Sequence, residues 1–158
     1  MNAAAPCVIL SEPQLAQNIG AAARVMANFG LEDLRLVRPR DGWPQKRAWA
    51  AASGAHWPLD GARVFARLEE AVADLRLVLA TTARPRGAAL PVLTPTQGAA
   101  RLAAAAGEGL AAGLLFGGER AGLGRNDLAL CQAIVTVSVD VRSSSPNIAQ
   151  EVAVDAYK

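Results

Sequence analysis

The chain has 158 residues, a net charge of +2 and a composition that is 52% hydrophobic but only 4% aromatic. This length suits a single domain whose core is built from Leu, Val, Ile and Ala. No apolar run approaches the roughly 20 residues that span a bilayer, and the N-terminus lacks the basic and apolar regions of a signal peptide. Two cysteines, Cys7 and Cys131, are too few for a disulfide framework. We expect both to be reduced core thiols in a cytoplasmic protein.

Hydrophobic patterning in the first half of the chain predicts strands that alternate with helices. Residues 7–12 are expected to form a short apolar strand. In residues 18–28, apolar side chains recur at helical spacing from Ile19 to Met26. Gly30 follows at a position where helix C-caps favour glycine. The other elements expected here are strands at 34–37, 62–65 and 76–82 and helices at 45–52 and 67–75.

The second half of the chain continues this alternation. Thr94 followed by Pro95 predicts a helix start, because threonine caps free N–H groups and proline is tolerated at the first helical position. We expect an alanine-rich helix from there to about Ala106. The remaining expected elements are strands at 113–116 and 133–139 and helices at 126–131 and 147–157.

This order of elements predicts an α/β fold, with a mainly parallel sheet flanked by helices, in a single domain of residues 1–158. In such sheets ligands bind beyond the carboxyl ends of the strands. Four polar or glycine-rich segments follow expected strands and would meet at that edge. They are residues 11–20, 81–87, 117–123 and 140–147.

A run of basic residues follows the second expected strand. Its members are Arg35, Arg38, Arg40, Lys46 and Arg47, opposed along the chain only by Asp41. Almost all basic residues of the chain are arginine, which suits bidentate contacts to phosphate. Two interpretations stay open: a solvated loop, or a patch that faces a polyanion.

Several kinds of chemistry lack the residues they need. The single histidine, His56, has no G-x-S-x-G partner for nucleophilic hydrolysis and is expected to be a structural or surface residue. No set of His, Cys and carboxylate side chains has the spacing of a metal site. The glycines at 117–124 are not followed by the G-K-[ST] of a phosphate loop.

The remaining polar residues at the expected strand ends suit a small polar ligand beside a phosphate-bearing one. They are Asn18, Arg24, Arg84, Glu119, Arg120, Ser145 and Asn147. Each also has a simpler explanation when taken alone. Asn18 and Asn147 suit helix N-caps, Arg24 suits a helix surface, and Glu119 with Arg120 suits a surface ion pair of little energetic value.

Three segments together resemble a known family. The stretches "NIGAAARVMANFG" at 18–30, "LLFGGERAGL" at 114–123 and "SSSPNIAQEVAV" at 143–154 are similar to the three ordered motifs of the SpoU, or SPOUT-class, RNA 2′-O-methyltransferases. "SEPQLAQNIG" at 11–20 and "TTAR" at 81–84 resemble the TrmJ-type tRNA subgroup. The resemblance extends over nearly the whole chain, from about Val8 to Tyr157.

The resemblance implies an α/β knot, in which the C-terminal segment threads through a loop to form a trefoil. It also implies a homodimer with S-adenosylmethionine as the methyl donor, and the ribose 2′-hydroxyl at position 32 of the tRNA anticodon loop as the acceptor. Because the donor's sulfonium already activates its methyl group, no metal is expected. What the protein must supply is alignment and help with removal of a proton.

Site roles follow from the same resemblance. The expected catalytic residues are Arg24, Asn18, Ser145, Asn147 and Glu119. The expected donor-binding residues are Ala80, Thr81, Thr82, Gly117, Gly118, Glu119, Val137, Val139, Ser145 and Asn147. The expected RNA contacts are Arg24, Arg84, Arg38, Arg40 and Arg120. Glu119 is expected to orient motif residues or Asn18, and Gly117 and Gly118 to let the backbone approach the donor. Arg24 is expected to hold a phosphate and stabilise a developing alkoxide, because a guanidinium stays protonated.

The sequence also departs from the subgroup. Pro146 stands where leucine is usual, so that one backbone N–H is missing there. If that group normally binds the donor, its loss removes about 0.5–1.5 kcal/mol of affinity. Ser143 replaces an aromatic residue, Asp140-Val141 replaces Asn-Pro, and the subgroup's C-terminal extension is expected to be absent after Lys158. The alternatives are therefore a catalytically impaired RNA-binding homologue, a ribosomal RNA methyltransferase, or an unrelated α/β nucleotide-binding enzyme.

Overall fold

The computed structural model describes residues 5–82, 89–119 and 122–136. They form a seven-stranded sheet with the order β3-β2-β1-β6-β4-β7-β5, in which every neighbouring pair is parallel. The strands are β1 (Cys7–Ser11), β2 (Leu34–Val37), β3 (Arg63–Phe65), β4 (Leu77–Thr82), β5 (Val92–Leu93), β6 (Ala112–Phe116) and β7 (Ala133–Thr136). The helices are α1 (Ala16–Asn28), α2 (Lys46–Ala51), α3 (Trp57–Asp60), α4 (Leu68–Ala71), α5 (Pro95–Gly107) and α6 (Arg125–Leu128). The predicted α/β class with a parallel sheet is confirmed.

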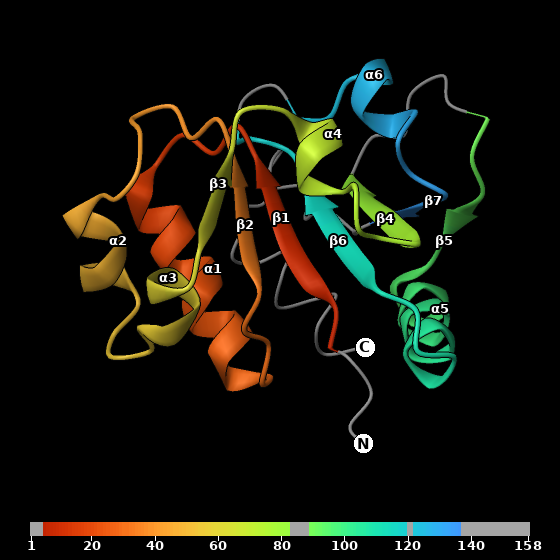
Figure 1. Cartoon of the computed structure of the whole chain (residues 1–158), viewed down its shortest axis with the longest axis horizontal. Coiled ribbons are helices and arrows are strands. Elements are labelled where there is room, and N and C mark those ends of the chain that lie inside the picture. The colour runs from red at the N-terminus through yellow and green to blue at the C-terminus, as the bar shows by residue number, and fades with distance from the viewer. Residues whose placement is uncertain (1–4, 83–88, 120–121, 137–158) are drawn as a thin grey trace, which may run out of the picture.

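Helices cover both faces of the sheet, so the central strands are buried on both sides (Figure 1). Successive side chains of a strand point to opposite faces. In β1, Val8 and Leu10 join the core beneath α1, α2, α3 and α5, whereas Cys7 and Ile9 join the core beneath α4 and α6. This two-sided burial explains why the central strands are continuous apolar runs and not alternating ones.

The helix α1 packs unusually closely against α2. A Cβ atom on Gly20 would lie 2.0 Å from the carbonyl oxygen of Ala48, so only glycine fits at this crossing. Ala22, Ala23 and Met26 of α1 are fully buried at the sheet. The first helix is therefore fixed both to the sheet and to its neighbouring helix.

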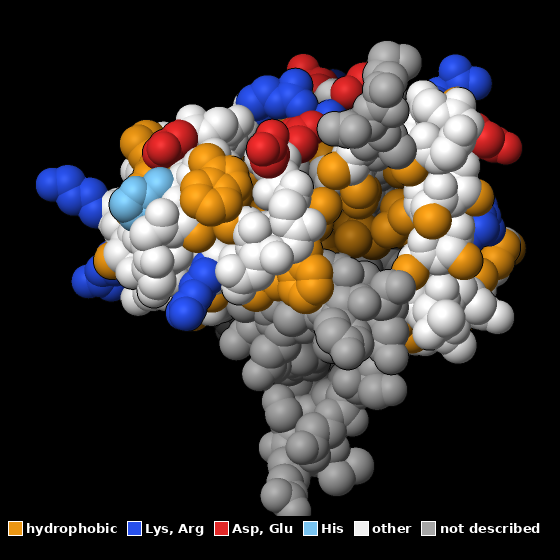
Figure 2. Space-filling view, turned by 90° about the horizontal axis from the view of Figure 1, so that it is seen from below, with side chains coloured by type: hydrophobic (Ala, Val, Ile, Leu, Met, Phe, Trp, Pro, Cys, Tyr) orange, Lys and Arg blue, Asp and Glu red, His pale blue; other side chains and the backbone are white. Residues whose placement is uncertain are grey.

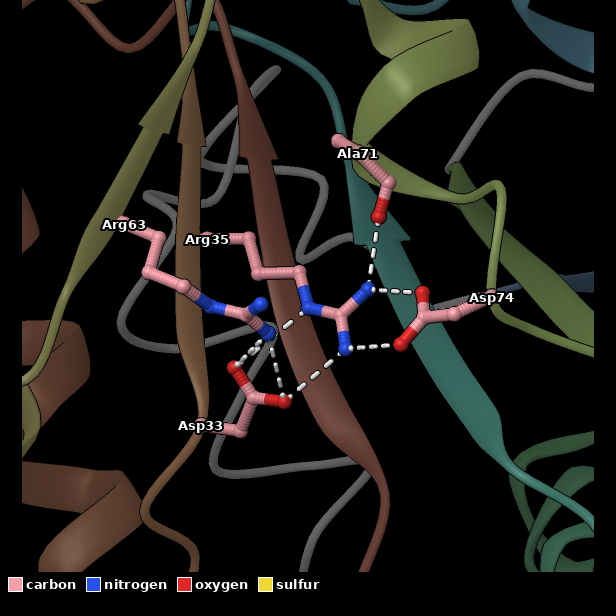
Figure 3. A network of polar contacts seen from close by, with 5 residues as sticks. All are labelled: Asp33, Arg35, Arg63, Ala71 and Asp74. Atoms are coloured by element: carbon pink, nitrogen blue, oxygen red, sulfur yellow. Dashed lines mark hydrogen bonds and ion pairs between the residues drawn. The ribbon is translucent and has the colours of Figure 1, made fainter.

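Arg35 is a buried strand residue, so neither open interpretation of the basic run, a solvated loop or a polyanion-facing patch, holds for it. Its side chain is 5% exposed and lies on the α4 side of β2. One guanidinium nitrogen, Nη1, donates to Asp74 Oδ1 at 2.6 Å and to the Ala71 carbonyl oxygen at 2.7 Å, and Nη2 donates to Asp33 Oδ2 at 3.0 Å (Figure 3). Arg63 of β3 also donates to Asp33. The charge of Arg35 is thus used to connect β2, β3 and the turn before β4.

The expected elements are present, with changes at their ends. The helix predicted at 67–75 is only the four residues of α4, because the chain turns at Asp74 to pair with Arg35 and enter β4. The short elements α3 and β5 were not predicted. Thr94 caps α5 as expected, with Gln97 completing a reciprocal capping box. The expected helix at 147–157, the end of the strand at 133–139 and the knot lie outside the described residues.

Seen from the amino ends, hydrophobic side chains gather in a hollow between α5 and the side of the molecule that holds α1–α3, and Lys and Arg side chains project from that side (Figure 2). In the described part of the chain, no helix is long and apolar enough to cross a membrane.

Both cysteines are free and buried, as predicted. Burial raises the pKa of Cys7 and of Cys131 to about 12, so both thiols stay protonated near neutral pH. Because the thiolate is the reactive form, the folded protein should react with a thiol reagent far more slowly than the protein in denaturant. Counting modified cysteines by mass spectrometry over time in both conditions checks this, and equal rates would contradict it.

The Arg35 network should also make stability depend on pH. The hydrogen bond from Arg35 lowers the pKa of Asp74. Burial acts to raise the pKa of Asp33, but hydrogen bonds from Arg35 and Arg63 outweigh it and lower that pKa. A lowered pKa in the folded state stabilises the fold above the unfolded pKa of about 4, and this contribution is lost as the pH falls through the folded value.

Asp74→Asn should therefore destabilise the protein at pH 7, and its difference from the unsubstituted protein should shrink below about pH 4. Urea unfolding at pH 7 and pH 3 measures both free energies of unfolding. Glu32→Gln, an exposed control outside the network, should change little at either pH. A difference for Asp74→Asn that is the same at both pH values would contradict the prediction.

Candidate functional site

The candidate site lies at the carboxyl ends of the adjacent central strands β1 and β6. The chain leaves β1 for α1 on one face of the sheet, and leaves β6 for α6 on the other face. Such a divergence of neighbouring connections opens a crevice at the edge of a parallel sheet, and ligands of α/β proteins bind there. The segment 11–20 and the described residues of 117–123, both singled out in the sequence, lie at this position, and we call 12–15 and 117–119 the β1 and β6 loops.

Glu119 connects these two loops. Its Oε2 accepts the backbone N–H of Gln14 at 2.8 Å, and its Oε1 accepts the side-chain amide of Asn18 at 3.2 Å. These contacts span 105 and 101 residues of chain. The expected contact between Glu119 and Asn18 is present. The contact with Gln14 was missed, because a backbone donor leaves no mark in a side-chain pattern.

Asn18 is held in the first turn of α1. The helix begins at Ala16 with Leu15 as its N-cap, so the explanation of Asn18 as an N-cap is wrong. Because its Nδ2 donates to Glu119, its Oδ1 is turned away from that carboxylate. Among the described residues, none donates a hydrogen bond to this oxygen. The half-buried Asn18 therefore presents an oriented acceptor at the crevice.

The glycines of the β6 loop are required by contacts within the chain. A Cβ on Gly117 would lie 2.4 Å from the backbone carbon of Gly122, and one on Gly118 would lie 2.5 Å from the carbonyl oxygen of Glu12. Gly122 itself has φ +67°, which favours glycine. The loop thus folds back on itself and presses against the end of β1, which places Glu119 within reach of Gln14 and Asn18.

The end of β4 contributes less than expected. Ala80 is fully buried on the α4 and α6 side of the sheet. Thr81 is 2% exposed, and its hydroxyl donates to the carbonyl oxygen of Leu115 at 3.0 Å. Their side chains are therefore part of the core and not of a ligand-facing wall. Thr82 is half-buried, so its side chain is the accessible one of the three.

Arg24 is not brought to the Asn18 and Glu119 pair within this chain. It is exposed on α1, six residues after Asn18, which is about 9 Å along the helix and about 240° around it. Among the described residues, none forms an ion pair with Arg24. Its explanation as an exposed helix residue is therefore confirmed, and it is free to contact another molecule.

The basic run after β2 divides into residues with different surroundings. Arg35 belongs to the core, as described above. Arg38 and Arg40 are exposed but paired with carboxylates, Arg38 with Glu12 at 3.4 Å and Arg40 with Asp41 at 3.1 Å. Lys46 and Arg47 are exposed at the start of α2. Counting charges along the chain therefore did not reveal that Glu12 opposes the charge of Arg38.

Other predicted residues lie outside the described part of the chain. They are Arg84, Arg120, Val137, Val139, Ser145 and Asn147. His56 is exposed, in agreement with its assignment as a surface residue. No group of three or more His, Cys, Asp or Glu side chains that could hold a metal occurs in residues 5–82, 89–119 and 122–136.

One cavity of about 520 Å³ lies elsewhere. It is lined by Glu32, Asp33, Trp57, Gly61 and Arg63. Asp33 and Gly61 precede β2 and β3, so the cavity is at the amino ends of the strands, at the opposite edge of the sheet from Glu119. Because Asp33 is already paired with Arg35 and Arg63, we assign no ligand to this cavity.

A family model described as the SpoU rRNA Methylase family matches residues 5–157. The chain belongs to this family. It is 40% identical over 151 residues to the tRNA (cytidine/uridine/adenosine-2′-O-)-methyltransferase TrmJ of Pseudomonas aeruginosa, an alignment that covers 96% of this chain and 58% of that protein. The chain thus spans 58% of the length of this relative, and 61% of the length of a similar relative from Salmonella typhimurium.

Solved structures of the SpoU family share the architecture. The crystal structure of TrmJ from Z. mobilis ZM4 matches with a TM-score of 0.91 at 55% identity, covering 98% of this chain and 67% of that one. The SpoU methyltransferase AviRb from Streptomyces viridochromogenes, in complex with AdoMet, matches with a TM-score of 0.74 at 19% identity, covering 99% of this chain and 59% of that one. AviRb thus has the same fold.

The contact between the two loops predicts that Gly117→Ala destabilises the protein. The added methyl group must displace the backbone at Gly122, which should lower the free energy of unfolding by about 1–3 kcal/mol. Gly107→Ala is the control, because no atom lies within 4 Å of its Cβ position at the end of α5. Urea unfolding of both variants measures the effect. Equal stability of the two would show that the β6 loop is not held closed.

Proposed function

We propose that the chain is the catalytic part of an S-adenosylmethionine-dependent tRNA ribose 2′-O-methyltransferase. The observation that carries the proposal is the Glu119 carboxylate, which orients Asn18 in the crevice between β1 and β6 of a SpoU-family fold. The names of the relatives support tRNA as the substrate class and the ribose 2′-oxygen as the acceptor. Similarity to a TrmJ structure over 98% of the chain supports the same assignment.

The finer parts of the proposal extend the resemblance seen in the sequence. The acceptor is the ribose at position 32 of the tRNA anticodon loop, and the active protein is a cytoplasmic homodimer. The C-terminal segment completes a trefoil knot, with Ser145 and Asn147 at the donor and the ribose. Val137, Val139, Arg84 and Arg120 keep their expected roles toward donor and RNA. No metal takes part, because the donor is already activated.

The described residues fit such a donor. Gly117, Gly118 and Glu119 are half-buried at the end of β6, so a ligand can reach part of this segment. Half-buried Thr82 lies at the end of the neighbouring strand β4. These residues would hold the donor through backbone groups and one hydroxyl. When bound, S-adenosylmethionine supplies a methyl group on a sulfonium that makes it electrophilic.

The chain's own residues align and assist the acceptor hydroxyl. Glu119 fixes the amide of Asn18, so that Asn18 Oδ1 accepts a hydrogen bond from a ribose 2′-hydroxyl and turns a lone pair of that hydroxyl oxygen toward the donor. Arg24 is exposed and positively charged, which suits contact with the phosphate beside that ribose. Because it lies on another side of α1 from Asn18, stabilising negative charge on the ribose oxygen would require Arg24 of the partner subunit in the proposed homodimer. Arg24 then acts on RNA that lies across α1, in keeping with its separation from Asn18.

The first test is calorimetric titration with S-adenosylmethionine, followed by transfer of a labelled methyl group to unmodified tRNA. Binding of about one donor per subunit and 2′-O-methylation of tRNA would support the proposal. Donor binding with transfer only to ribosomal RNA would favour the ribosomal alternative. RNA binding without donor binding would favour an impaired homologue in which Pro146 weakens the donor site, and preferential binding of ATP or NAD would favour an unrelated nucleotide-binding enzyme.

Glu119→Gln should slow methyl transfer by roughly 10- to 100-fold, because an amide cannot accept hydrogen bonds on both sides as the carboxylate does. Single-turnover rates with tRNA and labelled donor measure the effect. Glu108→Gln, exposed after α5, is the matched control and should keep its rate. An unchanged rate in Glu119→Gln would remove Glu119 from the mechanism.

Arg24→Ala should abolish methyl transfer while donor affinity stays within about twofold, because Arg24 is exposed on α1 and not at the end of β6. Calorimetry with the donor and transfer assays with tRNA measure the two quantities separately. Arg101→Ala, exposed on α5, is the control. Lost donor binding together with residual transfer would contradict the assigned role.

A further inference from the structure

Three exposed arginines line the carboxyl edge of the sheet beside the candidate site. Arg38 directly follows β2, Arg40 lies two residues later, and Arg67 follows β3. Their side chains are 47%, 51% and 70% exposed, so another molecule can reach them. We call Arg38, Arg40 and Arg67 the edge arginines.

Each edge arginine is paired with a carboxylate. Arg38 Nε lies 3.4 Å from Glu12 Oε1, and Arg40 Nε lies 3.1 Å from Asp41 Oδ1. Arg67 Nη2 lies 2.8 Å from Glu69 Oε2. The three pairs therefore carry no net charge together.

The backbone holds the first of these pairs in an uncommon conformation. Glu12 has φ +54° and Arg38 has φ +44°, values in the left-handed region that non-glycine residues rarely adopt. Such residues cost roughly 1–3 kcal/mol each and cluster at functional sites. Arg38 Nη1 also donates to the carbonyl oxygen of Ala66 at 2.7 Å. The ends of β1, β2 and β3 are thereby joined through one guanidinium.

The edge arginines are also continuous with the crevice. The N–H of Arg40 donates to the carbonyl oxygen of Pro13 at 2.9 Å, in the same loop that carries Gln14. Arg40 lies within the electrostatic reach of Glu119. An RNA strand whose ribose reaches Asn18 can therefore continue along this edge from β1 toward β3.

We propose that Arg38, Arg40 and Arg67 bind RNA phosphates next to the modified ribose, and that Glu12, Asp41 and Glu69 are built-in competitors which the phosphates displace. The inference rests on the proposed function and deepens it. An exposed ion pair is worth about 0–1 kcal/mol, so its exchange costs little. Arginine forms strong bidentate bonds to phosphate, which favours the exchange. The displaced carboxylates stay nearby and weaken RNA binding, because they repel the phosphates.

The test compares two charge-matched double variants. Glu12→Gln with Glu69→Gln removes two competitors at the edge. Glu32→Gln with Glu108→Gln makes the same change in net charge away from it, since both residues are exposed before β2 and after α5. Fluorescence anisotropy with unmodified tRNA transcript gives Kd at several salt concentrations. We expect the first variant to bind tRNA three- to tenfold more tightly and with a steeper salt dependence, and the second to change less than twofold.

The arginines are tested in the opposite direction. Arg38→Ala with Arg67→Ala should weaken tRNA binding at least tenfold and make it less dependent on salt, by up to about one unit of slope for each lost phosphate contact. Arg76→Ala with Arg101→Ala is the control, because both arginines are exposed elsewhere. Donor affinity, measured by calorimetry, should stay constant in all four variants.

The outcomes distinguish failure of this inference from failure of the proposed function. Equal tightening by both acid variants would mean that net charge alone matters, and no tightening at the edge would mean that the carboxylates do not compete; either result overturns the inference. If donor binding and methyl transfer persist in those cases, the proposed function stands. If the unsubstituted chain binds neither donor nor tRNA, both proposals fail together.

Discussion

The carboxylate of Glu119 holds together two loops that the fold sends to opposite faces of the sheet. The register of β1 on β6 places Leu10 beside Phe116, so four further residues lead to Gln14 and three further residues lead to Glu119. The glycines between them let the β6 loop lie against the end of β1. Without this contact, Asn18 would have no fixed orientation at the crevice. The geometry of the candidate site therefore depends on one acid and on the space left by missing side chains.

Two arginines, Arg35 within β2 and Arg38 directly after it, have different surroundings. Arg35 is buried, and two carboxylates and a carbonyl oxygen satisfy its guanidinium group. Arg38, three residues later, lies just after the strand in solvent, with a hydrogen bond to the Ala66 carbonyl oxygen and one long ion pair with Glu12. The first arrangement stabilises the sheet and cannot be exchanged cheaply. The second can exchange partners, which makes the carboxyl edge suitable for a ligand that comes and goes.

Local patterns predicted the elements well, because helix periodicity, buried apolar strands and the Thr94–Pro95 cap are properties of adjacent residues. The meeting of the β1 and β6 loops at the carboxyl edge of the sheet also followed from strand order and polar strand ends. The surroundings of Arg35 did not follow, since its partner Asp74 is 39 residues away and counting charges along the chain hides which face each side chain takes. Thr81 was predicted to bind the donor for a similar reason. Whether a residue near a strand end faces a ligand or a neighbouring strand is decided by sheet pairing.

The close crossing of α1 and α2 at Gly20 affects how mutations at this position would be interpreted. The helices meet through backbone atoms of Gly20 and Ala48, so position 20 admits no side chain at all. Asn18 lies two residues before Gly20 in α1, and Lys46 lies two residues before Ala48 in α2. A mutation at position 20 removes no functional group, yet it shifts both the site asparagine and the basic start of α2. In a genetic screen such a change would score with the loss-of-function alleles, and position 20 would be mistaken for part of the catalytic machinery.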